Sequence, residues 1–162
     1  MAASAGGGAA EQHGGGVSAL TDKDKKYYGP IKDVIAGLAI PEGARVLDIG
    51  PDIIPFKRAT EFVDWEVKTK LPGPVHKVDV ACEPLPFSDK SFDFIYCRQT
   101  LEDLYNPFLL CQEMQRVGKA GYIETPSPAA EMGRGVDVAS PPFRGYHHHR
   151  WVVWDNAGEL TF

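Results

Sequence analysis

Cysteine is scarce in this chain, and its scarcity argues against two kinds of small stabilised protein. The 162 residues include only Cys82, Cys97 and Cys111, an odd number with no CxxC spacing. A disulfide framework normally uses an even set of cysteines, and a structural zinc site uses closely spaced pairs. The sequence therefore predicts neither, and it favours reduced thiols in an intracellular protein.

An excess of basic charge and long apolar runs are also missing. Lysine and arginine total 17 against 22 aspartates and glutamates, which gives a formal net charge of -5. This balance argues against a protein whose main affinity is for nucleic-acid phosphates. No apolar run reaches the length of a membrane span. We expect neither a nucleic-acid partner nor a membrane segment, and the composition leaves the oligomeric state open.

The first 20 residues lack the side chains needed to build a core. Most are alanine, glycine or serine, so we expect residues 1–20 to be a disordered tail and residues 21–162 to form one domain. The tail has no arginine and no continuous apolar stretch, which argues against a secretory signal or a transit peptide. The cytoplasm is the expected location.

Beyond the tail, the pattern alternates between short strands and helices. A helix is predicted over 30–38, where apolar residues recur on one face, and short apolar runs ending in an acid or in glycine predict buried parallel strands. A second helix should begin at Pro107, with Asn106 as its N-cap and Gly118 as its end, and with an apolar face every third residue. The expected strands are 45–50, 61–64, 76–80, 94–97 and 122–123, and the expected apolar face of the second helix is Phe108, Cys111, Met114 and Val117.

This alternation is typical of an α/β fold with a Rossmann-like, doubly wound and mostly parallel sheet that binds its ligand at the carboxyl ends of the strands. The short connections predict reduced crossover helices. At the end of the chain, the runs 150–154 and 159–162 flank a turn and predict a hairpin. We expect this hairpin to add an antiparallel strand to one side of the sheet.

Three motifs occur in order along the chain and together resemble a class I S-adenosylmethionine-dependent methyltransferase. They are the run Val46-Leu47-Asp48-Ile49-Gly50, the acid Asp64 at the end of the second strand, and the segment 85–95 (LPFSDKSFDFI) followed by LEDLYNP at 101–107. The ordered spacing is more specific than any single motif. The chain resembles a divergent and shortened methyltransferase type 11-like domain.

The resemblance implies a transferase that uses S-adenosylmethionine as its cofactor, and it implies roles for individual residues. Asp48 would lie near the methionine amino end, with Gly50 and Pro51 in the close turn, and Asp64 would accept hydrogen bonds from the ribose hydroxyls. The remaining implied contacts are Asp79 with the adenine amino group, Leu85 beside the adenine ring, and Arg98 and Gln99 near the transferable methyl group.

One position departs from the family pattern. The glycine-rich turn usually has a second glycine two positions after the first, and this chain has Asp52 there. A carboxylate and a Cβ stand where bare backbone normally faces the ligand. Together with the reduced helices, this departure favours an alternative function, that of a noncatalytic binding or scaffold protein which keeps the fold and has lost the cofactor.

The segment from Gly145 to Trp151 carries three consecutive histidines. On a strand, His147 and His149 would share one face, and either could act as a catalytic general base near neutral pH. No CxxC or HExxH motif and no acid at a ligand spacing lies nearby, so the pattern predicts no metal site, although a metal-dependent hydrolase stays a third hypothesis. The histidines could also be a polar edge leading into the hairpin.

Other charged residues near the histidines suggest a substrate class. Arg134, Arg144 and Arg150 outnumber the acids of the same loop, which would suit a small-molecule or anionic methyl acceptor; the alternative is a solvated loop. We interpret Glu102 and Asp103 as capping residues before the second helix, because adjacent side chains diverge and do not form a catalytic acid pair.

Overall fold

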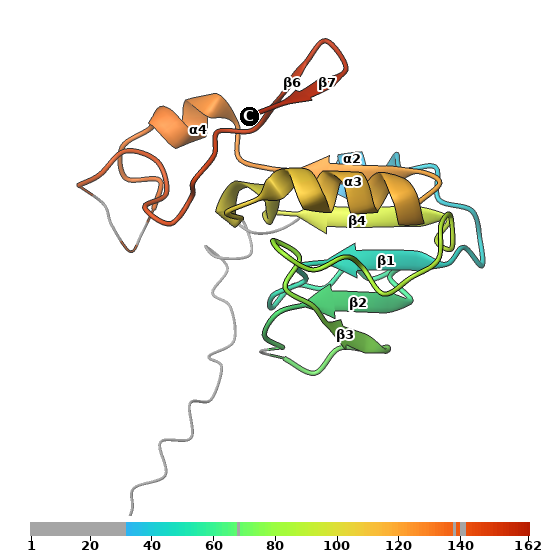
Figure 1. Ribbon diagram of the computed structural model, residues 1–162. Coiled ribbons are helices and arrows are strands. Elements are labelled where there is room, and N and C mark those ends of the chain that lie inside the picture. The colour runs from blue at the N-terminus through green and yellow to red at the C-terminus, as the bar shows by residue number, and fades with distance from the viewer. Residues whose placement is uncertain (1–31, 68, 138, 140–141) are drawn as a thin grey trace, which may run out of the picture. The chain divides into compact units, whose positions relative to one another are not determined.

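The computed structural model describes residues 32–67, 69–137, 139 and 142–162, and the predicted disordered tail lies outside them (Figure 1). The chain divides into two compact units, one ending at Ala36 and the other spanning Gly37–Phe162. The first unit contains helix α2, Lys32–Ala36. This helix is shorter than the predicted 30–38, because the chain turns at Gly37; residues 30 and 31 lie outside the described part.

The second unit is built on a parallel sheet of five strands in the order β3-β2-β1-β4-β5 (Figure 1). The chain leaves β1 toward β2 and β3 and then crosses to β4 on the other side of β1, so the order reverses between β1 and β4. This reversal is where doubly wound sheets bind ligands. The structure confirms the predicted parallel α/β fold with the following strands: β1 Val46–Ile49, β2 Glu61–Asp64, β3 Val75–Lys77, β4 Phe94–Arg98 and β5 Gly121–Glu124.

Burial explains the order of the strands. All of β1 and almost all of β4 are buried, because their residues are mostly apolar on both faces, whereas β3 and β5 at the sheet edges alternate between partly buried and exposed residues. One core joins the strands to helix α3, Pro107–Val117, through Ile95, Leu110 and Met114. This helix lies along β4 and β5 (Figure 1).

The predicted reduction of the crossover helices is confirmed. Within the described residues, the connections from β1 to β4 contain no helix. Aromatic side chains from these connections cover part of the sheet instead. The ring of Phe56 stacks on Tyr96 with centroids 4.2 Å apart, and Phe87 packs edge-on against Phe92 with centroids 4.7 Å apart. Loops that carry a few aromatic side chains therefore cover part of the sheet in place of helices.

The apolar face of α3 differs from the predicted one. Leu110, Met114 and Val117 are buried, whereas Phe108 is 50% exposed and Cys111 is half-buried. A strict spacing of three drifts around a helix of 3.6 residues per turn, so the predicted face could not stay in register with the core. The helix begins at the expected Pro107, but Asn106 makes no side-chain capping bond.

The carboxyl-terminal hairpin is also placed differently from the prediction. Its strands, β6 Trp154–Asn156 and β7 Glu159–Thr161, form a separate two-stranded antiparallel sheet. The predicted strand over 150–154 is wrong. The backbone amides of Arg150 and Trp151 both donate to the Glu102 carbonyl, so they do not form hydrogen bonds with a neighbouring strand. Among the described strands, β5 therefore stays at the edge of the parallel sheet.

Two short elements complete the fold: the 3₁₀ helix η1, Leu101–Asp103, directly after β4, and helix α4, Pro128–Met132, after β5. Ser127 caps α4 by accepting a hydrogen bond from the Ala130 amide. The described residues include no helix with the length and apolar character of a membrane span.

Candidate functional site

The turn after β1 depends on a glycine. Gly50 has φ of 68°, and a Cβ placed on it would lie 2.4 Å from the hydroxyl oxygen of Thr100. That hydroxyl donates to the Ile49 carbonyl at 3.3 Å, so the residue that follows β4 is hydrogen-bonded to the end of β1. The residue close to Gly50 in this structure is Thr100, and the approach of the turn to the cofactor stays a prediction. Pro51, next in the turn, is buried.

Asp52 has a backbone conformation that suits glycine. Its φ is 42°, in the left-handed region. Aspartate is one of the few residues that enter this region with little strain. The departure from the family pattern therefore adds a side chain at this point while the turn itself keeps a conformation that suits glycine.

Asp48 is buried under the turn that follows it. It is 1% exposed, and its Oδ2 accepts a hydrogen bond of 2.7 Å from the Phe56 amide. Burial raises the pKa of Asp48 to about 7; the nearby charge of Asp64 raises it further, and the Phe56 amide and the Arg98 charge lower it. The carboxyl group therefore holds the 50–56 turn in place.

Asp64 and Asp79 lie at the carboxyl ends of neighbouring strands. Asp64 is the last residue of β2, and Asp79 follows the end of β3, which stops at Lys77 and not at the predicted residue 80. One oxygen of each carboxylate caps a local turn. Asp64 accepts a hydrogen bond from the Glu66 amide and Asp79 accepts one from the Ala81 amide, both at 3.1 Å. Both side chains are half-buried.

A polar network joins the carboxyl ends of β4 and β5. Arg98 donates from Nε to Glu124 Oε1 and the Tyr122 hydroxyl donates to Oε2, both at 2.8 Å. The Glu124 carboxylate and burial together raise the pKa of Tyr122 above its ordinary value. Gln99, with φ of 51°, donates its amide to the Glu124 carbonyl. Arg98, the last residue of β4, and Gln99 are thus both bonded to Glu124 of β5, and their place near the transferable methyl group stays a prediction.

Leu85 belongs to the core. It is 3% exposed and packs with Val63 and Phe92, and its amide donates to Glu113 Oε2 at 2.7 Å. Its side chain is thus surrounded by protein.

The histidine segment reaches the same end of the sheet through η1. The Arg150 amide donates to the Glu102 carbonyl at 2.7 Å, and the Trp151 indole donates to the Leu104 carbonyl at 2.8 Å. Because η1 follows β4 directly, these bonds hold residues 147–151 near the carboxyl end of that strand. A segment remote in sequence is thereby brought to the predicted ligand-binding edge.

Each of the three histidines faces a carboxylate. His147 Nδ1 lies 2.5 Å from Asp137 Oδ2, and His149 Nδ1 lies 2.7 Å from Glu131 Oε1. His148 Nε2 is 3.9 Å from Asp103 Oδ1. The bond from His147 lowers the pKa of Asp137 to about 2. Local spacing gave no sign of these acids, because they come from other parts of the chain.

Glu102 is the residue that sequence reasoning missed. It is 1% exposed, and neither carboxylate oxygen has a hydrogen-bond partner among the described residues. The pKa of Glu102 is raised to about 8, chiefly by burial and also by the neighbouring Asp103 and Glu131 charges, while the backbone at residues 102 and 100 acts to lower it. The capping interpretation is therefore wrong for Glu102. The available signal was an acid shortly after the end of a buried strand.

Comparison with known protein families identifies the family of this chain. Residues 43–123, half of the chain, match the family described as methyltransferase domain. The chain belongs to the methyltransferase domain family. No curated protein and no solved structure matches the chain in the corresponding comparisons. The matched segment runs from β1 into β5, so it holds all the predicted cofactor residues and ends before the histidines.

The residues at the strand ends fit the cofactor that the methyltransferase family implies, with one exception. S-adenosylmethionine carries a ribose diol and amino groups, and carboxylates suit both. Asp64 and Asp79 supply such carboxylates at adjacent strand ends, each with one oxygen used in a turn. Asp48 does not fit the role of an open ligand, because its Oδ2 is engaged by the Phe56 amide inside the protein.

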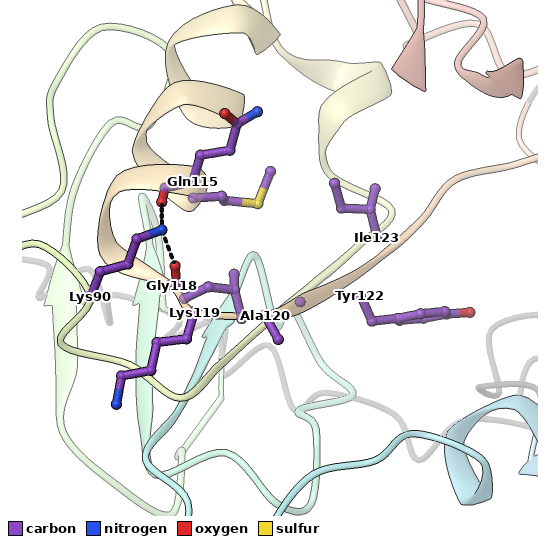
Figure 2. A pocket seen from close by; sticks show the side chains of 10 residues that line it. Lys90, Gln115, Gly118, Lys119, Ala120, Tyr122 and Ile123 are labelled. Carbon is purple, nitrogen blue, oxygen red and sulfur yellow. Dashed lines mark hydrogen bonds between the residues drawn. The ribbon is translucent and has the colours of Figure 1, made fainter. Parts of the chain in front are cut away.

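The methyltransferase domain also has a cavity away from these strand ends. It measures about 490 Å³ and lies along the exposed edge of β5 against the end of α3 (Figure 2). Lys90 at its rim donates from Nζ to the carbonyls of Gln115 and Gly118, at 2.6 and 2.9 Å, and this ties up the ammonium group. None of the predicted site residues lines this cavity.

Proposed function

We propose that the protein binds S-adenosylmethionine at the carboxyl ends of β1, β2 and β3 and transfers a methyl group to an acceptor. The observation that supports this most is that the Gly50 turn after β1, the Asp64 carboxylate at the end of β2 and the Asp79 carboxylate after β3 lie at the same edge of the sheet, with the Gly50 turn beside the reversal of the strand order. This is where doubly wound folds bind nucleotide-like ligands. When bound, the cofactor supplies a methyl group on a sulfonium that is already activated for displacement.

The residues of this chain would act mainly by binding and positioning. Asp64 would accept from the ribose hydroxyls and Asp79 from the adenine amino group. Asp48 would act indirectly, by fixing the 50–56 turn through the Phe56 amide. Arg98, held by Glu124, would keep a fixed positive charge at the end of β4. Because displacement at an activated carbon depends on alignment, positioning supplies much of the rate.

His147 is the better of the two predicted general bases. Its Nδ1 is paired with Asp137, so its Nε2 is left to accept a proton, and its side chain is 53% exposed. His149 is also paired with a carboxylate, but its side chain is only 7% exposed. An acceptor hydroxyl or amine that must lose its proton could reach His147 more readily.

Arginines near the histidines support an anionic small molecule as the acceptor. Arg134 and Arg144 face each other across an isolated antiparallel bridge, and both residues are exposed. The acids of this loop, Glu131 and Asp137, are bound to histidines. The loop therefore presents more positive than negative charge to a ligand.

Calorimetric titration with S-adenosylmethionine and with S-adenosylhomocysteine tests the proposal. We expect micromolar binding that weakens at least tenfold in Asp64→Asn, since the amide cannot accept two hydroxyl hydrogen bonds as a carboxylate does. Asp89→Asn, the same change at an exposed carboxylate paired with Arg116, should bind as the wild type does.

A noncatalytic binding protein is the alternative function. The specific observation in its favour is that Asp48, the acid of the first motif, is buried and engaged by the protein's own backbone. Absence of binding at millimolar cofactor, with the protein shown to be folded, would support this alternative and reject methyl transfer.

A further inference from the structure

Three side chains beside η1 form a group of metal-ligating type, which we call the Asp103 cluster: Asp103, His148 and His149. One potential ligand atom from each of the three lies within 4.8 Å of the other two. Asp103 comes from η1 and the histidines from the segment bonded to it. Asp103 lies inside the segment matched by the methyltransferase family, and the two histidines lie beyond the end of that segment. The cluster is separate from the Asp64 and Asp79 carboxylates.

Hydrogen bonds select the imidazole nitrogens that could bind a metal ion. Glu131 Oε1 lies 2.7 Å from His149 Nδ1, so Nδ1 carries the proton and Nε2 keeps its lone pair. His148 presents Nε2 toward Asp103 Oδ1 at 3.9 Å. A carboxylate on the far nitrogen of a ligating histidine is the usual support of a metal site, because it fixes the tautomer and the ring orientation.

Buried carboxylate oxygens beside the cluster lack partners. Asp103 Oδ1 and both oxygens of Glu102 are buried and make no hydrogen bond among the described residues. With Glu131, three carboxyl groups meet here. The Arg150 guanidinium makes its hydrogen bonds to the backbone carbonyls of residues 103 and 148 and lies 3.8 Å over the Tyr105 ring. Buried carboxylates without partners are costly, and a bound cation would satisfy them.

We propose that the Asp103 cluster binds a divalent first-row transition-metal ion, with Asp103, His148 and His149 as its protein ligands. Two imidazoles and one carboxylate suit zinc, iron, cobalt or manganese, whereas magnesium and calcium prefer sites made only of oxygen. Three protein ligands leave further coordination positions for water or substrate. The side chains of Asp103 and His148 are 42% and 50% exposed, so solvent can reach these positions.

The distances allow this ion with a small movement. Metal bonds of roughly 2.0–2.2 Å place neighbouring ligand atoms about 3–4 Å apart. The separation of 3.9 Å between Asp103 and His148 already meets this requirement. The other two pairs of ligand atoms are no more than 4.8 Å apart, so a shift of roughly 1 Å brings them into this range.

A second group, Asp137 with His147 and His148, is a weaker candidate for the same ion. Its acid is already used: Asp137 Oδ2 lies 2.5 Å from His147 Nδ1 and accepts from the His147 amide at 3.3 Å. His148 belongs to both groups, so one ion at the Asp103 cluster would occupy it. His147 then stays available as the base proposed above.

The test is competition between the full chain, stripped of metal with a chelator, and a chromophoric chelator loaded with zinc. We expect one zinc ion per chain with a dissociation constant of micromolar or lower. Asp103→Asn and His148→Gln should each weaken binding about 100-fold, and Glu131→Gln about 10- to 100-fold, the range typical of lost support for a ligand. His76→Gln is the matched control, because His76 is half-buried and also faces a carboxylate, Glu61, at 3.0 Å.

Cobalt provides a second readout that separates ligation from folding. Cobalt bound by the wild-type chain should show visible d–d bands that change in His148→Gln, a substitution at an exposed side chain, and do not change in His76→Gln. Equal zinc affinity in the wild type and in the Asp103 and His148 variants, or no zinc binding by a folded chain, would overturn the proposal. Cofactor titration is a separate measurement, so either proposal can fail alone.

Discussion

Replacing Asp48 with asparagine should change how the stability of the protein depends on pH. In the folded protein, burial raises the pKa of Asp48 to about 7, whereas an unfolded aspartate titrates near its ordinary value of 3.8. Between these values the folded state binds one more proton than the unfolded state, so the free energy of unfolding falls as pH rises. Asparagine keeps an oxygen that can accept from the Phe56 amide at 2.7 Å, and it does not titrate.

The expected size of the effect follows from the linkage. At 1.36 kcal/mol per unit of pKa shift, the full contribution is about 4 kcal/mol, of which about 3 kcal/mol falls between pH 5 and pH 8. Urea unfolding of both proteins at several pH values measures this directly. The wild type should lose about 3 kcal/mol relative to Asp48→Asn over that range, and most of the loss should come before pH 7.5. Parallel stability curves for the two proteins would refute the assignment of a buried, proton-binding Asp48.

Two further predictions concern the turn after β1. Gly50→Ala should destabilise the protein by about 3 kcal/mol, because alanine is strained at a φ of 68° and its Cβ would meet the Thr100 hydroxyl. Adding Thr100→Ala to this variant should recover part of the lost stability. Urea unfolding that shows no loss of stability in Gly50→Ala would contradict the close approach. Asp52→Gly should change the unfolding free energy by no more than about 1 kcal/mol, because glycine accepts a φ of 42° at least as well. The same variant should bind S-adenosylmethionine several-fold more tightly in calorimetric titration, and an unchanged affinity would favour the noncatalytic alternative.

The sheet could be predicted from the sequence because its signals are local. Each buried strand is a short, mostly apolar run, and Gly50 and Asp64 mark the ends of β1 and β2. β2 has the predicted bounds, and β1 and β4 differ by about one residue at their ends. The hairpin could not be placed in this way. Its preceding residues, 150 and 151, are held by one carbonyl far back in the chain, at Glu102, and no local pattern reports that bond.

The candidate site also has one part with local sequence signals and one part without them. Asp64 and Asp79 follow strands, so the rule that ligands bind at the carboxyl ends of parallel strands was enough to bring them together. The histidines and their acids are joined by contacts between Asp137 and His147 and between Glu131 and His149, and neither spacing matches a ligand motif. Such a cluster forms only after the chain beyond β5 has folded back onto η1.

Glu102 shows why that fold-back matters for function. A carboxyl group that is 1% exposed and has no hydrogen-bond partner among the described residues destabilises the folded state. Its backbone carbonyl meanwhile accepts from both Arg150 and Trp151, so the residue that orders the histidine segment also puts an unsatisfied acid beside it. A glutamine would suffice for the backbone role. The carboxyl group is explained if the space it borders holds positive charge in the working protein, and a divalent ion at the Asp103 cluster would provide that charge.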